Sequence, residues 1–457
     1  MALTDAKDLP KRRSPRRLPA RVQDWLAGEH AAAQRMAGTA FAIRVASAAV
    51  VFASQILLAR WMGSFEYGTY VYVWTWLLLL GDLVHFGLPL TAQRQIPEYT
   101  GRQAPDLLRG YLSGSRWLTF ALGTAAAILG ALMVRLLEGA LDRHVIMPLY
   151  LACVALPFYA LSFMLDGIAR SYNWIALGLA PHSLFRPIIV LALMAGVYAA
   201  GLPMDATTAM ATVAVAVWLT TLLQLLVFER RLAGVVAAGP RAYEIKAWFT
   251  TSLPMFAVWG LYTLLTTTDV LVLQQFRPAD EVAHYYAASK TLTLVTFVYF
   301  AVAASAAHRF TTYHVAGDRD GLAAFVAKTI RWIFWPSLAM TLLMLAFGKP
   351  MLWLFGPGFV AAYPVMFVLA VGLLARAAVG PAERLLTMVG QQRLCALAYA
   401  AAFAVGLTGC LVLAGPYGSM GVAAATSAAF VVESVLLFLI ARRKLGLTLF
   451  VWRRTGL

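Results

Sequence analysis

The sequence has little charge and few cysteines, and both shortages limit what the protein can be. Only 13% of its 457 residues are charged, whereas 61% are hydrophobic. Soluble domains have about a quarter of their residues charged, so an ordinary soluble fold is excluded. The three cysteines, Cys153, Cys395 and Cys410, lie singly in apolar runs, which argues against both a disulfide framework and a metal site.

Long polar segments are also missing. No stretch between two apolar runs is long enough for a soluble domain, and no catalytic constellation, nucleotide loop or metal motif is present. We therefore expect neither an enzyme nor a cofactor. The net charge of +16 is spread over short segments between apolar runs, a distribution that reports membrane orientation rather than a nucleic-acid partner. The basic N-terminus has no apolar segment close behind it and does not resemble a cleavable signal peptide.

What the sequence has in abundance is apolar runs long enough to span a membrane, which takes about 20 residues. It therefore predicts an all-α, polytopic membrane protein with twelve transmembrane helices. These spans lie near 40–59, 69–90, 117–137, 145–165, 174–199, 207–228, 254–275, 284–307, 329–347, 361–380, 394–414 and 420–441.

Lysine and arginine decide the orientation. The two tails and the even-numbered connections hold 28 of them, and the odd-numbered connections hold four, Arg60, Arg143, Arg277 and Lys349. The positive-inside rule places both termini in the cytoplasm, and we expect the cell inner membrane. The predicted divisions are a basic tail at 1–38, a six-helix bundle at 39–235, a second at 236–445 and a tail at 446–457. Within the first tail, residues 21–37 fit either a short interfacial helix or a solvated one.

An internal repeat supports the two bundles. At an offset of 215 residues, EYGTY at 66–70 falls on EVAHY at 281–285, and Arg94 falls on Arg309. Six helices per copy is an even number, so both copies have the same orientation. The sequence thus predicts two parallel six-helix repeats around a central cavity.

Asp269 and Lys290 are predicted to form an ion pair. A bare carboxylate in a membrane span costs roughly 2.5–3.5 kcal/mol on insertion scales. Asp269 lies before the outer end of span seven and Lys290 lies after the start of span eight, each roughly 9 Å below the outer surface. A helix-locking pair is the simpler interpretation. Asp269 as a cavity-facing cation or proton site is the alternative.

Arg186 is the strongest candidate for binding a substrate. It lies near the middle of span five, between Pro181 and Pro187, where we expect a kinked or broken helix. That span carries no carboxylate, so Arg186 is either a cavity-facing anion site or a partner of Asp82 or of another helix's polar groups. His182 lies one turn earlier and is expected to share its role.

Arg44, Arg376 and Asp82 are weaker candidates at the cytoplasmic ends of their helices. Either arginine alone is expected to extend toward the aqueous surface, but one belongs to each half and both could ring the mouth of the cavity. Asp82 could pair with Arg44. Glu433, in span twelve, has no evident partner in the sequence.

Several short motifs resemble the polysaccharide-exporter branch of the MOP superfamily, the Wzx-type flippases. They cover most of the chain between residues 40 and 440, in the family's order and spacing. In sequence they read ARWMGSFEYGTY (59–70), FGLPLTAQRQIPEY (86–99), LPMFAVWGLYTLLTTTDVLVL (253–273), HYYAASK (284–290), LFGPGF (354–359) and MVGQQR (388–393). Twelve spans rather than fourteen set the chain apart from the lipid II flippase branch.

The resemblance implies a flippase that carries a polyprenyl-pyrophosphate-linked oligosaccharide, a precursor of surface polysaccharide such as lipopolysaccharide or exopolysaccharide, by alternating access. Its partners would be membrane lipid and the polysaccharide polymerase and assembly proteins. A cation-coupled multidrug exporter of the same superfamily is the alternative, disfavoured because deep bases match or exceed deep acids. A membrane-embedded glycosyltransferase or polymerase is disfavoured by the short, acid-poor outer connections.

Overall fold

The computed structural model describes residues 20–297, 302, 313, 318–447 and 449–451, and in this part of the chain it contains helices and no strand. The N-terminal half comprises α1 (Ala20–Val84), α2 (Leu88–Gly101), α3 (Pro105–Leu136), α4 (Arg143–Ser171), α5 (Ile175–Ala180), η1 (Pro181–Phe185), α6 (Arg186–Ala199) and α7 (Ala206–Ala233). The C-terminal half comprises α8 (Ile245–Phe276), α9 (Ala279–Thr293), α11 (Arg319–Ala346), α12 (Gly348–Phe355), η2 (Pro357–Ala362), α13 (Tyr363–Val379), α14 (Ala382–Met388) and α15 (Gln392–Leu445).

Nine helical segments of the described chain are long and apolar enough to cross a membrane, and two of them hold a sharp turn. α1 turns at Gly63 and α15 turns at Gly418, both with the positive φ that glycine tolerates. The two arms of α1 lie side by side, since the Tyr67 hydroxyl donates to Gln55 Oε1 over 2.9 Å. These segments make eleven crossings and α9 begins another, which is consistent with the predicted twelve. Much of the predicted eighth span, 284–307, lies outside the described residues.

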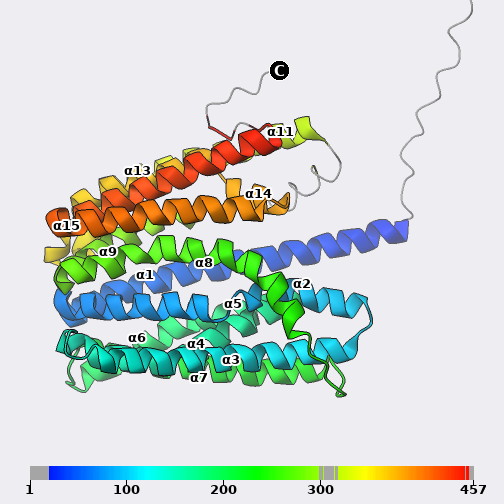
Figure 1. Cartoon of the computed structure of the whole chain (residues 1–457), viewed down its shortest axis with the longest axis horizontal. Coiled ribbons are helices and arrows are strands. Elements are labelled where there is room, and N and C mark those ends of the chain that lie inside the picture. The colour runs from blue at the N-terminus through cyan, green and yellow to red at the C-terminus, as the bar shows by residue number, and fades with distance from the viewer. Residues whose placement is uncertain (1–19, 298–301, 303–312, 314–317, 448, 452–457) are drawn as a thin grey trace, which may run out of the picture.

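Residues 21–37 do not form a separate short helix. α1 runs from Ala20 with no break before Gly63, so this segment is the N-terminal part of the first spanning helix. In Figure 1 it projects beyond the rest of the bundle.

Two equivalent caps support the internal repeat. Glu66 Oε2 accepts a hydrogen bond from the Ala206 backbone N–H at the start of α7 over 2.8 Å. Glu281 Oε1 accepts one from the Ser419 N–H, at the start of the second arm of α15, over 2.6 Å. The two glutamates are separated by the 215-residue offset of the repeat. In each half, therefore, the second helix caps the N-terminus of the sixth.

The outward faces of the bundle are apolar. Trp117 is 71% exposed and Leu136 is 69% exposed on α3, and Val412 is 63% exposed on α15. Apolar surface on this scale is unfavourable in water but matches a lipid environment, in which helices satisfy their own backbone groups. The protein is therefore a multi-pass membrane protein.

The two halves lie next to each other with their long helices side by side (Figure 1). They are in close contact at the end that carries Gly63, which we call the Gly63 end. There Gly68 faces Ala279 so closely that a Cβ on Gly68 would lie 1.8 Å from the Ala279 carbonyl oxygen. The Tyr67 ring, which is fully buried, packs against Tyr286 and Phe359 of the C-terminal half. Aromatic side chains thus close the space between the halves at the Gly63 end.

Candidate functional site

A cavity of about 390 Å³ lies between the halves, lined by α1, α4, η1, α6, α7, α9 and the residues just after α9. Its wall is mainly apolar and aromatic with a few polar groups, as is usual for ligand sites. Two formal cations, Arg186 and Lys290, lie in the wall, and no aspartate or glutamate does so among the described residues. The polar and aromatic lining side chains are Phe52, Ser54, Gln55, Tyr70, Trp74, Tyr159, Phe163, His182, Arg186, Tyr286, Lys290, Thr293 and Phe297.

Arg186 is positioned by a break in the fifth span, as the two prolines predicted. A π-helical turn, η1, separates α5 from α6, and Arg186 is the first residue after it. The side chain is only 4% exposed. Its Nη2 donates to the Ser162 hydroxyl over 2.9 Å, and its guanidinium lies 4.7 Å from the centre of the Tyr159 ring.

Within the described residues, Arg186 forms no ion pair, and its Nε is buried without a hydrogen-bond partner. The alternative pairing with Asp82 is therefore not formed, whereas the alternative contact with a polar group of another helix is formed, with Ser162 of α4. A buried guanidinium with an unused N–H is costly unless something supplies the missing acceptor. The cavity beside it is the place from which an anion can do so.

His182 lies one turn before Arg186 and lines the same cavity. Its Nδ1 lies 3.2 Å from the Gly178 carbonyl oxygen, and its ring packs on Phe163 with a centroid distance of 5.2 Å. Neighbouring helices hold this irregular segment. Gln224 of α7 donates to the Leu177 carbonyl over 3.0 Å, and the hydroxyls of Ser47 and Ser183 lie 3.2 Å apart.

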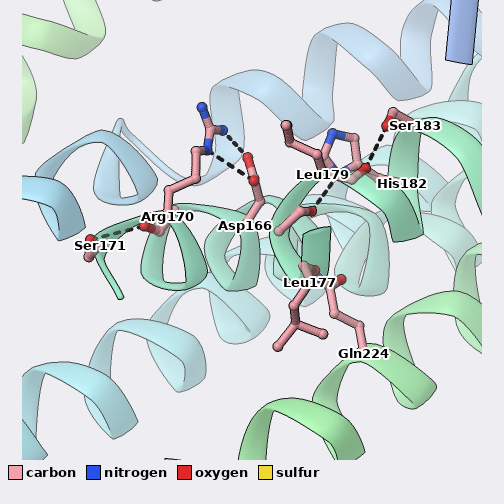
Figure 2. Close-up of polar contacts among 10 residues, drawn as sticks. Asp166, Arg170, Ser171, Leu177, Leu179, His182, Ser183 and Gln224 are labelled. Atoms are coloured by element: carbon pink, nitrogen blue, oxygen red, sulfur yellow. Dashed lines mark hydrogen bonds and ion pairs between the residues drawn. The ribbon is translucent and has the colours of Figure 1, made fainter. Parts of the chain in front are cut away.

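An ion pair that the sequence analysis missed lies close to this segment. Arg170 donates from Nε to Asp166 Oδ1 over 3.0 Å and from Nη2 to Asp166 Oδ2, a bidentate arrangement that Figure 2 shows. Asp166 is 1% exposed, and Gly178 of α5 packs directly against its carboxylate. The spacing of four residues on α4 is the signal that could have found the pair. It contributes no free carboxylate to the cavity.

The predicted direct ion pair between Asp269 and Lys290 is wrong. Asp269 Oδ2 accepts from the Tyr285 hydroxyl over 2.7 Å, and Oδ1 accepts from the Val270 N–H over 2.8 Å. Lys290 does not come within ion-pair distance of it, and its ammonium lies 4.7 Å from the centre of the Tyr286 ring, on the cavity wall. Tyr285, which precedes Lys290 on the same helix, forms the hydrogen bond to the carboxylate instead. Asp269 is therefore engaged in hydrogen bonds within the C-terminal half, and Lys290 faces the cavity.

Arg376 lies away from the cavity and pairs with Glu433, whose partner the sequence did not reveal. Arg376 Nε lies 3.3 Å from Glu433 Oε1, and the guanidinium packs on the rings of Tyr262 and Phe430 at 5.2 and 4.8 Å. A void of about 20 Å³ adjoins the pair, room for about one water molecule. The hypothesis that Arg376 helps ring the cavity mouth is not supported, because its charge is engaged within the C-terminal half.

Arg44 and Asp82 lie near the cavity without lining it. Arg44 is exposed and lies one turn before Ala48, which does line the cavity. Asp82 Oδ2 accepts from the Thr263 hydroxyl of α8 over 3.4 Å, a contact between the halves. Asp82 forms no ion pair within the described chain, so the expected pairing with Arg44 is not formed either.

Comparison with solved structures identifies the fold. A multidrug resistance MATE family transporter of the MOP superfamily, in an inward-facing conformation, aligns with a TM-score of 0.71 at 12% identity, covering 88% of this chain and 94% of that one. The lipid II flippase MurJ in an inward closed conformation gives 0.69 at 14% identity, with 88% and 87% covered. A MOP superfamily transporter from Pyrococcus furiosus, described as having a binding pocket of reverse polarity, gives 0.66 at 11% identity, with 90% and 95% covered.

No curated protein matches the sequence. A family described as "Polysaccharide biosynthesis protein" matches residues 38–308, which is more than half of the chain. This match and the shared fold agree with the resemblance read from the short motifs. The protein therefore belongs to the polysaccharide biosynthesis protein family.

Proposed function

We propose that the protein is a flippase that carries a lipid-linked oligosaccharide across the cytoplasmic membrane, with the pyrophosphate of the lipid held by Arg186. The observation that carries this proposal is the charge of the cavity wall, which holds Arg186 and Lys290 and no carboxylate among the described residues. A wall of this charge favours an anionic cargo.

The chemistry of Arg186 fits a pyrophosphate. Its planar guanidinium can donate two parallel hydrogen bonds to a phosphate. Because the side chain is 4% exposed, those bonds would form in a medium of low dielectric constant, where they are stronger than in water. Lys290 lies across the cavity on α9 and would add a second positive charge from the other half.

The transport cycle follows from the arrangement of the halves. A pyrophosphate with its sugars cannot cross hydrocarbon unaided, since each unpaired polar group costs several kcal/mol. We propose that the head group enters the cavity while the polyprenyl tail stays in the bilayer. Rocking of the bundle 39–235 against the bundle 236–445 would then open the cavity to the other side. The lysine and arginine bias favours an orientation with both termini in the cytoplasm, in which the Gly63 end would lie at the outer face.

The multidrug exporter is the second candidate, because a MATE transporter shares the fold. A cationic drug needs a carboxylate in its path. The acids on the described spanning helices that could serve are each engaged elsewhere: Asp82 with Thr263, Asp166 with Arg170, Asp269 with Tyr285, and Glu433 with Arg376. This arrangement favours the flippase.

The test is transport by purified protein in sealed liposomes. We expect translocation of a polyprenyl-pyrophosphate-linked oligosaccharide, measured as the fraction of its sugar that an enzyme added outside can oxidise or cleave. Protein-free liposomes and liposomes containing heat-denatured protein are the controls. Movement of a cationic dye without movement of the lipid-linked sugar would contradict the proposal and favour the exporter.

A further inference from the structure

We propose that Trp74 is the surface on which the cavity binds the first sugar of its cargo. This inference rests on the proposed function and names a part of the substrate that the charge of the wall does not address. Trp74 lies on the second arm of α1, is half-buried and lines the cavity.

Two tyrosines hold the Trp74 ring in place. Tyr70, 3% exposed, stacks on it with a centroid distance of 6.4 Å and an interplanar angle of 15°. Tyr159, 2% exposed, meets it edge-on at 6.1 Å and 87°. Contacts with two buried aromatic rings leave the indole little freedom, so a ligand that packs on it loses little binding free energy to ordering the ring.

Tyr159 also sets the distance between Trp74 and the proposed anion site. The same ring that contacts Trp74 lies under the Arg186 guanidinium, 4.7 Å from it. A pyrophosphate is bonded directly to the first sugar of a lipid-linked oligosaccharide. A phosphate bound at Arg186 therefore places that sugar one ring away, within reach of Trp74.

The local chemistry suits a sugar ring. The C–H face of a pyranose packs on an aromatic surface, while its hydroxyls need hydrogen-bond partners. No hydrogen bond engages the Trp74 indole N–H within the described residues, and Ser54 and Gln55 of the first arm of α1 line the cavity with it. An aromatic surface with a few polar groups beside a cation would bind a sugar-bearing lipid more tightly than the bare lipid pyrophosphate.

The experiment measures binding of two ligands to the full-length protein in detergent: polyprenyl pyrophosphate, and the same lipid carrying N-acetylglucosamine on its pyrophosphate. We expect the sugar to tighten binding by about tenfold in the unchanged protein. Trp74→Leu should remove this advantage, so that the two ligands bind with equal affinity, and Trp74→Phe should retain part of it. Trp61→Leu is the matched control, because Trp61 lies on the same helix, is half-buried and stacks on a tyrosine, Tyr198, outside the cavity.

The outcomes separate this inference from the proposed function. If Trp74→Leu keeps the full advantage of the sugar, or if Trp61→Leu loses it equally, Trp74 does not bind the sugar. If the unchanged protein binds neither lipid, the proposed anion site fails and the sugar site fails with it. A third outcome is that the bare lipid binds, that Arg186→Gln weakens this binding, and that the sugar adds no affinity. This outcome would support the flippase and reject the role of Trp74.

A separate observation concerns the Gly63 end. The geometry points to Arg60 as a contact that holds the two halves together there. Arg60 Nε and Nη2 donate to the carbonyl oxygens of Leu354 and Trp353, each over 2.7 Å, and the guanidinium lies 4.9 Å from the centre of the Trp353 ring. Both acceptors are at the C-terminal end of α12, where the helix dipole is negative. The Trp353 carbonyl also accepts from the Gly356 N–H over 3.0 Å.

The repeat supplies a natural comparison. Arg277 lies after the seventh span, two residues beyond the position that the 215-residue offset gives for Arg60. It also donates to two backbone carbonyls, those of Ala414 and Gly415, over 3.2 and 2.6 Å. Its acceptors belong to its own half, whereas those of Arg60 belong to the other half. Separation of the halves at the Gly63 end must therefore break the Arg60 contact and can leave the Arg277 contact intact.

The consequence can be measured as a distance between the halves. Spin labels would be placed at Leu202 and Tyr417, exposed residues near the Gly63 end on α6–α7 and α15, after replacement of the three cysteines by serine. We expect Arg60→Gln to raise the ratio of long to short distances by about tenfold, the size expected from lost charged hydrogen bonds. Arg277→Gln should leave the distribution as it was. Unchanged distances in Arg60→Gln, or the same shift in both variants, would overturn the inference.

Discussion

Replacing Arg186 with glutamine is expected to abolish transport while leaving the protein folded in the membrane. Each hydrogen bond from a charged group contributes about 1.5–3 kcal/mol, so losing the contact to the pyrophosphate should weaken binding by about 10–100-fold. Arg186→Lys keeps the charge but not the planar pair of donors, and intermediate activity is expected. The measurements are binding of polyprenyl pyrophosphate and transport in liposomes.

The expected effect on stability distinguishes a binding role from a structural one. Within the described residues, Arg186 has no acidic partner, so its removal leaves no carboxylate uncompensated. Removing a buried charge of this kind relieves a desolvation cost, and the free energy of unfolding of Arg186→Gln should stay equal or rise. A variant that loses transport together with stability would show instead that Arg186 is needed to fold the bundle.

The architecture could be predicted because it depends on quantities that a sequence displays directly. Apolar length gives the spans. The orientation that lysine and arginine indicate stays a prediction. The break at η1 could be predicted as well, because Pro181 and Pro187 remove backbone donors wherever the helix lies. These features need no knowledge of which helix packs on which.

The partners of the buried charges could not be predicted, because depth along a helix does not determine which face points inward. The sequence predicts the same depth for Asp269 and Lys290, but the partner of the carboxylate is the Tyr285 hydroxyl. Arg376 and Glu433 come from α13 and α15, and only the packing of those helices brings them together. Asp166 was missed for a simpler reason: the predicted span ended at residue 165, whereas α4 continues to Ser171.

The repeat predicts a central cavity, but most of the side chains that line it could not be read from the sequence. Trp74 and Tyr70 fit the pattern of an interfacial aromatic belt, and half-burial against Tyr159 is a property of the assembled helices. The position of Arg186 near the middle of a span was informative, because a charge at that depth is retained only for a reason. The structure adds that the unused Nε lies beside the cavity that Trp74 also lines.

Replacing Arg376 with methionine is expected to destabilise the protein, in contrast to replacement of Arg186. Glu433 is 3% exposed and pairs with Arg376 at 3.3 Å, so Arg376→Met leaves a buried carboxylate without its cation. Breaking a buried pair in this way costs about 3–5 kcal/mol. Glu433→Gln should cost less, because the guanidinium keeps its contacts with the rings of Tyr262 and Phe430 and is partly exposed.

The double variant Arg376→Met with Glu433→Gln tests whether the two residues act as a pair. If they do, it should recover most of the stability that Arg376→Met loses, since no charge is then left buried. Thermal unfolding of the purified protein in detergent measures all three variants. If the stability losses of the two single variants simply add in the double variant, the two side chains are not coupled. If Arg376→Met is as stable as the unchanged protein, another group neutralises Glu433. Recovery of stability in the double variant would show that Arg376 supports the C-terminal half. The equal or higher stability expected of Arg186→Gln would show that Arg186 has no such structural role.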